Sequence, residues 1–148
     1  MEIIERTRTV AAGADEVWAV LSDFGAISGW AANVDHSCLL TDQSTGVGAV
    51  RRIQTGRTTL RETVETWEPP TTLGYRISGL PPVVRSVTNT WHVAAAGNRT
   101  EIVLRTEIDA GHRPPGRLVA KVVGSRLSSA SDLLLDGLQR AVEGGRDE

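Results

Sequence analysis

Residues 10–30 read VAAGADEVWAVLSDFGAISGW, and this stretch decides the fold. The chain passes from the end of a strand through a helix entry, GADE, into a short apolar helix that breaks at SDFG, and a second short apolar element ends on Trp30. A parallel α/β fold needs one crossover helix after its first strand, so two short helices disfavour that class. They suit a sheet that curls around a space and is closed at one end by both helices. The stretch therefore predicts a protein with an internal cavity.

The composition limits the class of protein. The chain has 148 residues, enough for one domain whose core needs no metal or disulfide. Its 16 Lys and Arg against 18 Asp and Glu leave no basic excess for nucleic acid, so we expect no nucleic-acid partner. Cys38 is the single cysteine, which excludes an intramolecular disulfide and favours the reducing cytoplasm.

The sequence also bears on membranes, metals and assembly. No apolar run approaches the roughly 20 residues of a membrane span, and the N-terminus is unlike a signal peptide. His36, His92 and His112 lack the short spacing of metal ligands, so we expect no metal and no cofactor. We therefore expect a single cytoplasmic domain over residues 1–148, a monomer or homodimer without membrane insertion.

The order of secondary structure follows from hydrophobic periodicity. From Arg117 onward, apolar residues recur at steps of three and four, which predicts one long amphipathic helix ending near Gly144. Strands joined by short turns pair antiparallel, and so long a terminal helix packs across their sheet. The fold class is therefore α+β. The predicted strands are residues 2–10, 33–42, 47–55, 58–67, 72–78, 83–94 and 99–109.

Several pieces of the chain, taken in order, resemble one superfamily. They are ADEVWAVLSDFGAISGW, GVGAVR at 46–51, RETVE at 61–65, GYRI at 74–77 and the closing helix. Together they span nearly the whole chain and resemble the START-like (SRPBCC) superfamily, whose members include the birch-pollen-allergen family, plant abscisic-acid receptors and bacterial polyketide cyclase/dehydrase proteins. The resemblance implies the helix-grip fold, in which a seven-stranded antiparallel sheet wraps around the C-terminal helix with an internal cavity between them.

Strand alternation, combined with this resemblance, assigns side chains to the cavity. Arg51 and Ile53 would face inward on one strand, and Glu62 on the next. Because burying an unpaired charge is costly, we expect Arg51 and Glu62 to pair. The pair is either a structural ion pair that ties two strands or an anchor for a ligand. The other expected ligand-binding residues are Trp30, Tyr75, Ile77, Ser86, His92, Arg105 and Ser128.

Two of these assignments leave alternatives open. Trp30 either lines the mouth of the cavity or plugs the core. Ser128 belongs to a run of small residues that interrupts the apolar face of the long helix although helix propensity disfavours them, namely Gly124, Ser125, Ser128, Ser129 and Ser131. The run allows either close packing of the helix on the sheet or space for a ligand.

The resemblance implies two functions of different kinds. The first is binding of a small hydrophobic, polyketide-like or lipid-like ligand in the cavity. The alternative is an enzyme of the polyketide cyclase, aromatase or dehydrase type, in which Arg51 polarises a carbonyl and Glu62 or His92 transfers protons. A protein-interaction role with a vestigial pocket is a third class. The carboxylate-binding Lys of the abscisic-acid receptors falls near Ala32 here, which disfavours acid binding in their manner.

Overall fold

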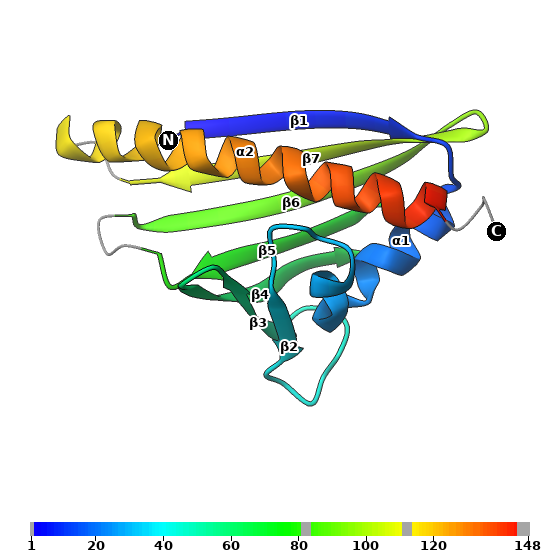
Figure 1. The fold of residues 1–148 in the computed structure, drawn as a ribbon, viewed down its shortest axis with the longest axis horizontal. Helices are drawn as coiled ribbons and strands as arrows, with labels where there is room; N and C mark the ends of the chain where they lie inside the picture. Colours follow the sequence, from blue (N-terminus) through cyan, green and yellow to red (C-terminus); the bar gives the residue numbers. More distant parts are fainter. Residues whose placement is uncertain (1, 81–83, 111–113, 145–148) are drawn as a thin grey trace.

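The computed structural model describes residues 2–80, 84–110 and 114–144, and for residues 114–120 it describes the backbone alone. Seven strands form one antiparallel sheet in the order β1-β7-β6-β5-β4-β3-β2, and α2 crosses one face of it (Figure 1). The α+β helix-grip fold is therefore confirmed. The strands are β1 Glu2–Val10, β2 His36–Leu39, β3 Val50–Thr55, β4 Thr58–Glu68, β5 Thr72–Ser78, β6 Ser86–Ala96 and β7 Arg99–Asp109, and the helices are α1 Ala14–Ser22, η1 Phe24–Gly29 and α2 Pro114–Gly144.

Some element limits differ from the predicted ones. The second strand is four residues long, and the third starts at Val50 because Gly46 and Gly48, with φ of 84° and 98°, form a turn before it. The sixth strand starts at Ser86, and Val83 lies outside the described residues. The last helix begins at Pro114, since proline is tolerated in the first turn of a helix.

The two short helices close one end of the sheet. Asp15 and Glu16 lie in the first turn of α1, where negative charge complements the helix dipole, and the Glu16 carboxylate accepts a hydrogen bond from the Gly13 amide at 3.4 Å. The helix buries Val17 and Leu21. The 3₁₀ helix η1 follows at once and contacts β2 and β3, while α1 contacts α2. Both helices therefore fix the end of the space under the sheet.

Two arginines on β1 hold α2 against the edge of the sheet. Arg6 pairs with Asp132 at 3.3 Å, and Arg8 pairs with Asp136 at 2.9 Å. The aspartates are four residues apart, so both lie on one face of the helix. Because β1 is an edge strand, these pairs also cover one margin of the sheet.

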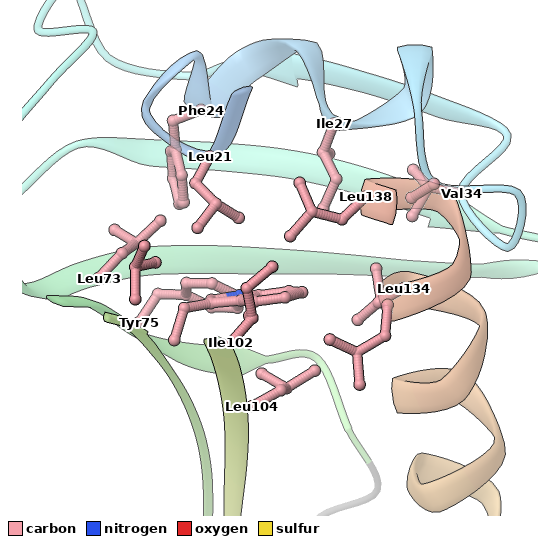
Figure 2. Packing of buried hydrophobic residues seen from close by; sticks show 14 of the residues in the cluster. Leu21, Phe24, Ile27, Val34, Leu73, Tyr75, Ile102, Leu104, Leu134 and Leu138 are labelled. Atoms are coloured by element: carbon pink, nitrogen blue, oxygen red, sulfur yellow. The ribbon is translucent and has the colours of Figure 1, made fainter. Parts of the chain in front are cut away.

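The hydrophobic core lies between the inner face of the sheet and the helices. Figure 2 shows Phe24 and Ile27 of η1, Tyr75 of β5, and Leu134 and Leu138 of α2 gathered in one cluster. On β6 and β7 every second residue is buried, which identifies the inner face of those strands. The largest side chains buried there and elsewhere in the core are Phe24, Leu73, Tyr75, Trp91, Ile102, Leu104, Ile108, Leu135 and Leu138.

Candidate functional site

A pocket of about 250 Å³ lies between the inner face of the sheet and α2. Its walls come from η1 and the loop that follows it, from four neighbouring strands, and from one face of α2. Most of the wall is apolar, as in sites for small molecules. The lining residues are Ile27, Asn33, Val34, Ile53, Thr55, Leu60, Glu62, Tyr75, Ile77, Asn89, Leu127, Ala130 and Leu134.

A buried ion pair stands at one wall of this pocket. Arg51 and Glu62 are directly opposite each other on β3 and β4, and their exposed fractions are 2% and 3%. The Arg51 Nε and Nη2 both donate to Glu62 Oε1 at 2.7 Å, so the expected pairing is confirmed. This geometry satisfies both charges within the protein, as a buried pair requires.

The remaining contacts of Arg51 turn it away from the pocket. Its Nη1 donates to the Phe24 carbonyl oxygen at 2.9 Å. The guanidinium carbon lies 3.8 Å from the ring centroid of Phe24 and 4.7 Å from that of Tyr75. Such contacts with aromatic rings stabilise a cation. Arg51 is not among the lining residues, and it serves to join β3, β4 and η1.

A buried hydrogen-bond network fixes the hydroxyl of Tyr75. The Tyr75 oxygen accepts from Trp91 Nε1 at 3.2 Å and from Asn89 Nδ2 at 3.4 Å. Asn89 Oδ1 in turn accepts from the Thr106 hydroxyl at 2.6 Å. With two donors on its oxygen, the phenol keeps its own O–H proton for a further acceptor.

The protonation of Tyr75 follows from its surroundings. Burial raises the pKa of the phenol above its usual value, and the negative charge of Glu62 raises it further. Arg51 and the hydrogen bonds from Trp91 and Asn89 act in the opposite direction but do not offset the increase. Tyr75 is therefore a neutral hydrogen-bond donor at physiological pH.

Two acceptor atoms at the pocket have no hydrogen bond within the described residues. Asn33 Oδ1 is buried and has no partner among them. For Glu62 the hydrogen bonds from Arg51 both go to Oε1, and within the described part of the chain no bond is found to Oε2. Asn33 Oδ1 has almost no accessible surface, so of these two atoms Glu62 Oε2 is the one that a molecule in the pocket can reach with a donor.

The structure places four of the predicted ligand-binding residues in the pocket wall, namely Ile53, Glu62, Tyr75 and Ile77. Trp30 lies beside the network instead, with its ring edge-on to Trp91 at 6.1 Å. It is half-buried and packs against the core, which favours the second of its two readings. Whether any of these residues binds a ligand stays a prediction.

Three predicted cavity residues face away from the pocket, so their inward placement is wrong. His92 is exposed, and Ser86 is half-exposed on the same outer face of β6. Arg105, on the outer face of β7, pairs with Glu5 and Glu107. On both strands the side chains that face inward are those one residue away from the expected ones, and a shift of one residue exchanges the two faces of a strand. His92 therefore does not share the pocket with Glu62.

The run of small residues in α2 serves packing in its first half. A side chain at Gly124 would meet Ile4 and Glu2 at 3.5 Å, so the helix lies close to β1 there. Ser128 accepts a hydrogen bond from Arg6 and is not a lining residue, contrary to expectation. Ala130, which stands between these residues, lines the pocket, while none of the Gly and Ser residues does. Close packing of the helix is therefore the interpretation that the contacts of Gly124 and Ser128 favour.

Some residues of the pocket were missed from the sequence. Asn89, which lines the pocket, is a polar residue between the apolar Val87 and Trp91 on the inner face of β6. Its hydrogen-bond partner Thr106 is not a lining residue and lies between Leu104 and Ile108 on β7. That pattern was available as an indication of a buried polar pair. Asn33 lies in a loop, where alternation carries no information about direction.

The described residues also bear on metal binding and on membranes. Within the described residues, no three or more His, Cys, Asp and Glu side chains gather so as to hold a metal ion. Across the described ranges, none of the helices combines the length and apolar character needed to cross a membrane.

Comparison with solved structures supports the fold. The Zhui aromatase/cyclase from Streptomyces sp. R1128 is 25% identical to this chain with a TM-score of 0.72, and the match covers 97% of this chain and 97% of that one. A START superfamily protein from Mycobacterium smegmatis is 17% identical with a TM-score of 0.72, covering 96% and 97% of the two chains. Norcoclaurine synthase from Thalictrum flavum is 18% identical with a TM-score of 0.78, covering 98% and 96%. The last two similarities show the fold alone.

Comparison of sequences identifies the family. No curated protein matches the chain. The sequence model of the family described as polyketide cyclase/dehydrase and lipid transport matches residues 1–143. Since this match spans nearly the whole chain, the chain belongs to the polyketide cyclase/dehydrase and lipid transport family.

Proposed function

We propose that the protein binds a small, largely apolar molecule in the pocket between the sheet and α2. The pocket carries this proposal: it holds about 250 Å³, its wall is mainly aliphatic, and it offers a few polar atoms at fixed positions. Unfilled apolar space in a core is destabilising because the lining atoms lose packing partners. A ligand that fills the space restores those contacts and gains affinity from them.

The family supports the chemical class of this ligand. Its description names polyketide cyclases, dehydrases and lipid transport, and the aromatase/cyclase compared above is similar over its whole length. A polyketide-like or lipid-like molecule is mainly apolar and carries spaced oxygens. Such a molecule matches a wall of Ile, Leu and Val side chains that is interrupted by Glu62, Tyr75 and Asn89.

Native mass spectrometry tests this function. The purified protein is incubated with a bacterial metabolite extract, and retained masses are compared between wild type and Ala130→Leu, which adds a larger side chain to the pocket wall. Ala141→Leu is the matched control, because Ala141 is an exposed residue of the same helix. We expect a ligand to be retained by wild type and control, and the fraction of protein that retains it to fall at least about fivefold for Ala130→Leu. A mass retained equally by all three proteins would place the ligand outside the pocket.

Acid–base catalysis is a second candidate, favoured by one observation. The Glu62 carboxylate and the neutral Tyr75 hydroxyl line the same pocket from neighbouring strands. Tyr75 can donate a hydrogen bond to a ligand carbonyl while Glu62 Oε2 accepts the proton from the adjacent carbon, which produces an enolate stabilised by that hydrogen bond. Arg51 and His92 take no part in this scheme, because Arg51 is engaged by Glu62 and Phe24 and His92 is exposed.

Proton exchange on a simple ketone tests the second candidate. With 2-tetralone in D₂O, NMR follows deuterium incorporation next to the carbonyl. General acid–base catalysis contributes about 10²–10⁴-fold, so Glu62→Gln should lower a catalysed exchange rate by about that factor. Glu65→Gln is the control, since Glu65 is an exposed carboxylate of the same strand that also pairs with an arginine. Exchange at the buffer rate with wild-type protein would exclude this activity for the ketone.

A further inference from the structure

We infer that the pocket selects uncharged ligands that carry a hydroxyl group and rejects carboxylic acids, with Glu62 as the residue that determines this specificity. This inference rests on the proposed binding function and concerns the chemistry of the ligand. It follows from which polar atoms at the pocket are already used within the protein and which are not.

One acceptor of the pocket wall is left for a ligand. Glu62 Oε1 takes both hydrogen bonds from Arg51, and within the described residues no hydrogen bond is found to Oε2. Because Glu62 lines the pocket, a ligand that brings an O–H or N–H group to Oε2 is favoured over one that does not.

The described part of the pocket wall carries no positive charge. Among the lining residues that the structure describes, Glu62 is the one charged side chain. Arg51, the nearest cation, is held by Glu62, by the Phe24 carbonyl and by two aromatic rings. A bound carboxylate would therefore lose its hydration, find no cation, and lie near the Glu62 charge. Like charges in a desolvated site are repulsive, which discriminates against acids.

Because of Tyr75, a ligand hydroxyl group fits the pocket better than a ligand group that can only donate a hydrogen bond. Its oxygen already accepts from Trp91 and Asn89, so its O–H proton is directed to a further acceptor. Tyr75 is opposite Val64, which makes it the diagonal neighbour of Glu62 across β4 and β5. A ligand hydroxyl can accept from Tyr75 and donate to Glu62 at once, whereas a ketone or ether satisfies Tyr75 alone.

The volume limits the size of the ligand. An engineered apolar cavity of about 150 Å³ is known to hold one benzene molecule. The pocket here holds about 250 Å³, which corresponds to roughly two fused rings. A naphthalene skeleton is therefore a suitable probe, because substituents on it change the charge and the hydrogen bonding with little change in shape.

Calorimetric titration with three naphthalene compounds tests the inference. At pH 7, 2-naphthol is neutral and carries a hydroxyl, naphthalene has no polar group, and 2-naphthoate is an anion. For the wild-type protein we expect 2-naphthol to bind more tightly than naphthalene, and at least about tenfold more tightly than 2-naphthoate.

Substitution of Glu62 provides the decisive comparison. Glu62→Gln removes the negative charge and should reduce the preference for 2-naphthol over 2-naphthoate to within about threefold. Glu65→Gln changes an exposed, Arg76-paired carboxylate of the same strand and should leave the preference unchanged. If Glu62→Gln does not fold, the double variant Arg51→Met with Glu62→Met removes both charges together and should show the same reduced preference.

The outcomes separate this inference from the proposed function. If none of the three compounds binds and a naphthalene-saturated NMR spectrum shows no shift of pocket residues, the proposed function fails. If the compounds bind but 2-naphthoate binds as tightly as 2-naphthol, the specificity inference is overturned while the binding function stands. A preference for 2-naphthol that persists in Glu62→Gln and in the double variant also overturns it, because the charge at Glu62 would then not be its cause.

Discussion

At the scale of single residues, Arg51 and Glu62 satisfy each other's charge in the core of the protein. Removing one partner of a buried pair leaves an uncompensated charge, which costs about 3–5 kcal/mol, whereas replacing both by apolar residues is often neutral. We therefore expect Glu62→Met to lower the free energy of unfolding by about that amount. Arg51→Met combined with Glu62→Met should recover most of it. Urea denaturation of the single and double variants measures both values.

A second arginine–glutamate pair, exposed on the outer face of the sheet, serves as a control. Arg76 and Glu65 are both more than 40% exposed and 3.2 Å apart. Exposed pairs contribute about 0–1 kcal/mol, so Glu65→Met should change stability little. A loss of similar size for Glu65→Met and Glu62→Met would mean that burial of the pair has no special weight.

Tyr75 permits a direct test of its environment, since it is the single tyrosine of the chain. Its pKa is raised by burial and by Glu62, so the folded state holds the phenolic proton above pH 10, where the unfolded chain releases it. Stability should therefore be independent of this group below pH 10 and fall above it, by up to about 1.4 kcal/mol per pH unit. Tyrosinate absorbance gives the pKa, and Tyr75→Phe should remove this part of the slope. Titration of Tyr75 near pH 10 in folded protein would contradict the prediction.

Residue directions could be predicted in one part of the sheet and not in another. On β3 and β4 the inward placement of Ile53 and Glu62 is confirmed by burial. On β6 the expected inward set, which includes Ser86 and His92, lies on the outer face, whereas Val87, Trp91 and Val93 lie on the buried face. A family resemblance fixes the order of strands but not which of two alternating sets faces inward, and a polar residue such as Asn89 on the inner face weakens the pattern.

At the scale of elements, two glycines of α2 are expected to behave in opposite ways. A side chain at Gly137 would collide with the Trp30 carbonyl oxygen and lie 3.3 Å from the Ala31 Cα, and backbone cannot move aside cheaply. At Gly124 the nearest atoms are side-chain carbons at ordinary contact distance. Because alanine favours a helix by up to about 1 kcal/mol over glycine, Gly124→Ala should be neutral or stabilising. Gly137→Ala should destabilise by about 1–3 kcal/mol.

Thermal unfolding of the two variants measures this difference, and Gly144→Ala at the open end of the helix is the reference. Equal effects at positions 124 and 137 would mean that the loop after η1 yields to the helix. Gly137 could not be recognised in the sequence, because its neighbour is Trp30, more than a hundred residues away. The helix itself was predictable, since its apolar period is a local property.

At the scale of the whole molecule, the sequence predicted the architecture better than the site. Strand alternation and the apolar period of the long helix are patterns within short stretches of sequence, so seven strands and one closing helix follow from them. The pocket depends on how Asn33, Glu62, Asn89 and Ala130 meet from a loop, two strands and a helix. Its volume and the direction of the Arg51 donors are set by packing across these elements, which periodicity does not describe.

The pocket between the sheet and α2 has a mechanical consequence. Internal void volume is lost when a protein unfolds, so hydrostatic pressure favours the unfolded state in proportion to that void. The pocket of about 250 Å³ between sheet and helix is partly open, and Ala130→Leu fills part of it, so the wild-type protein should unfold at lower pressure than Ala130→Leu. Tryptophan fluorescence under pressure gives both midpoints, and equal midpoints would contradict the prediction. The space that admits a ligand would thus also make the folded chain compressible.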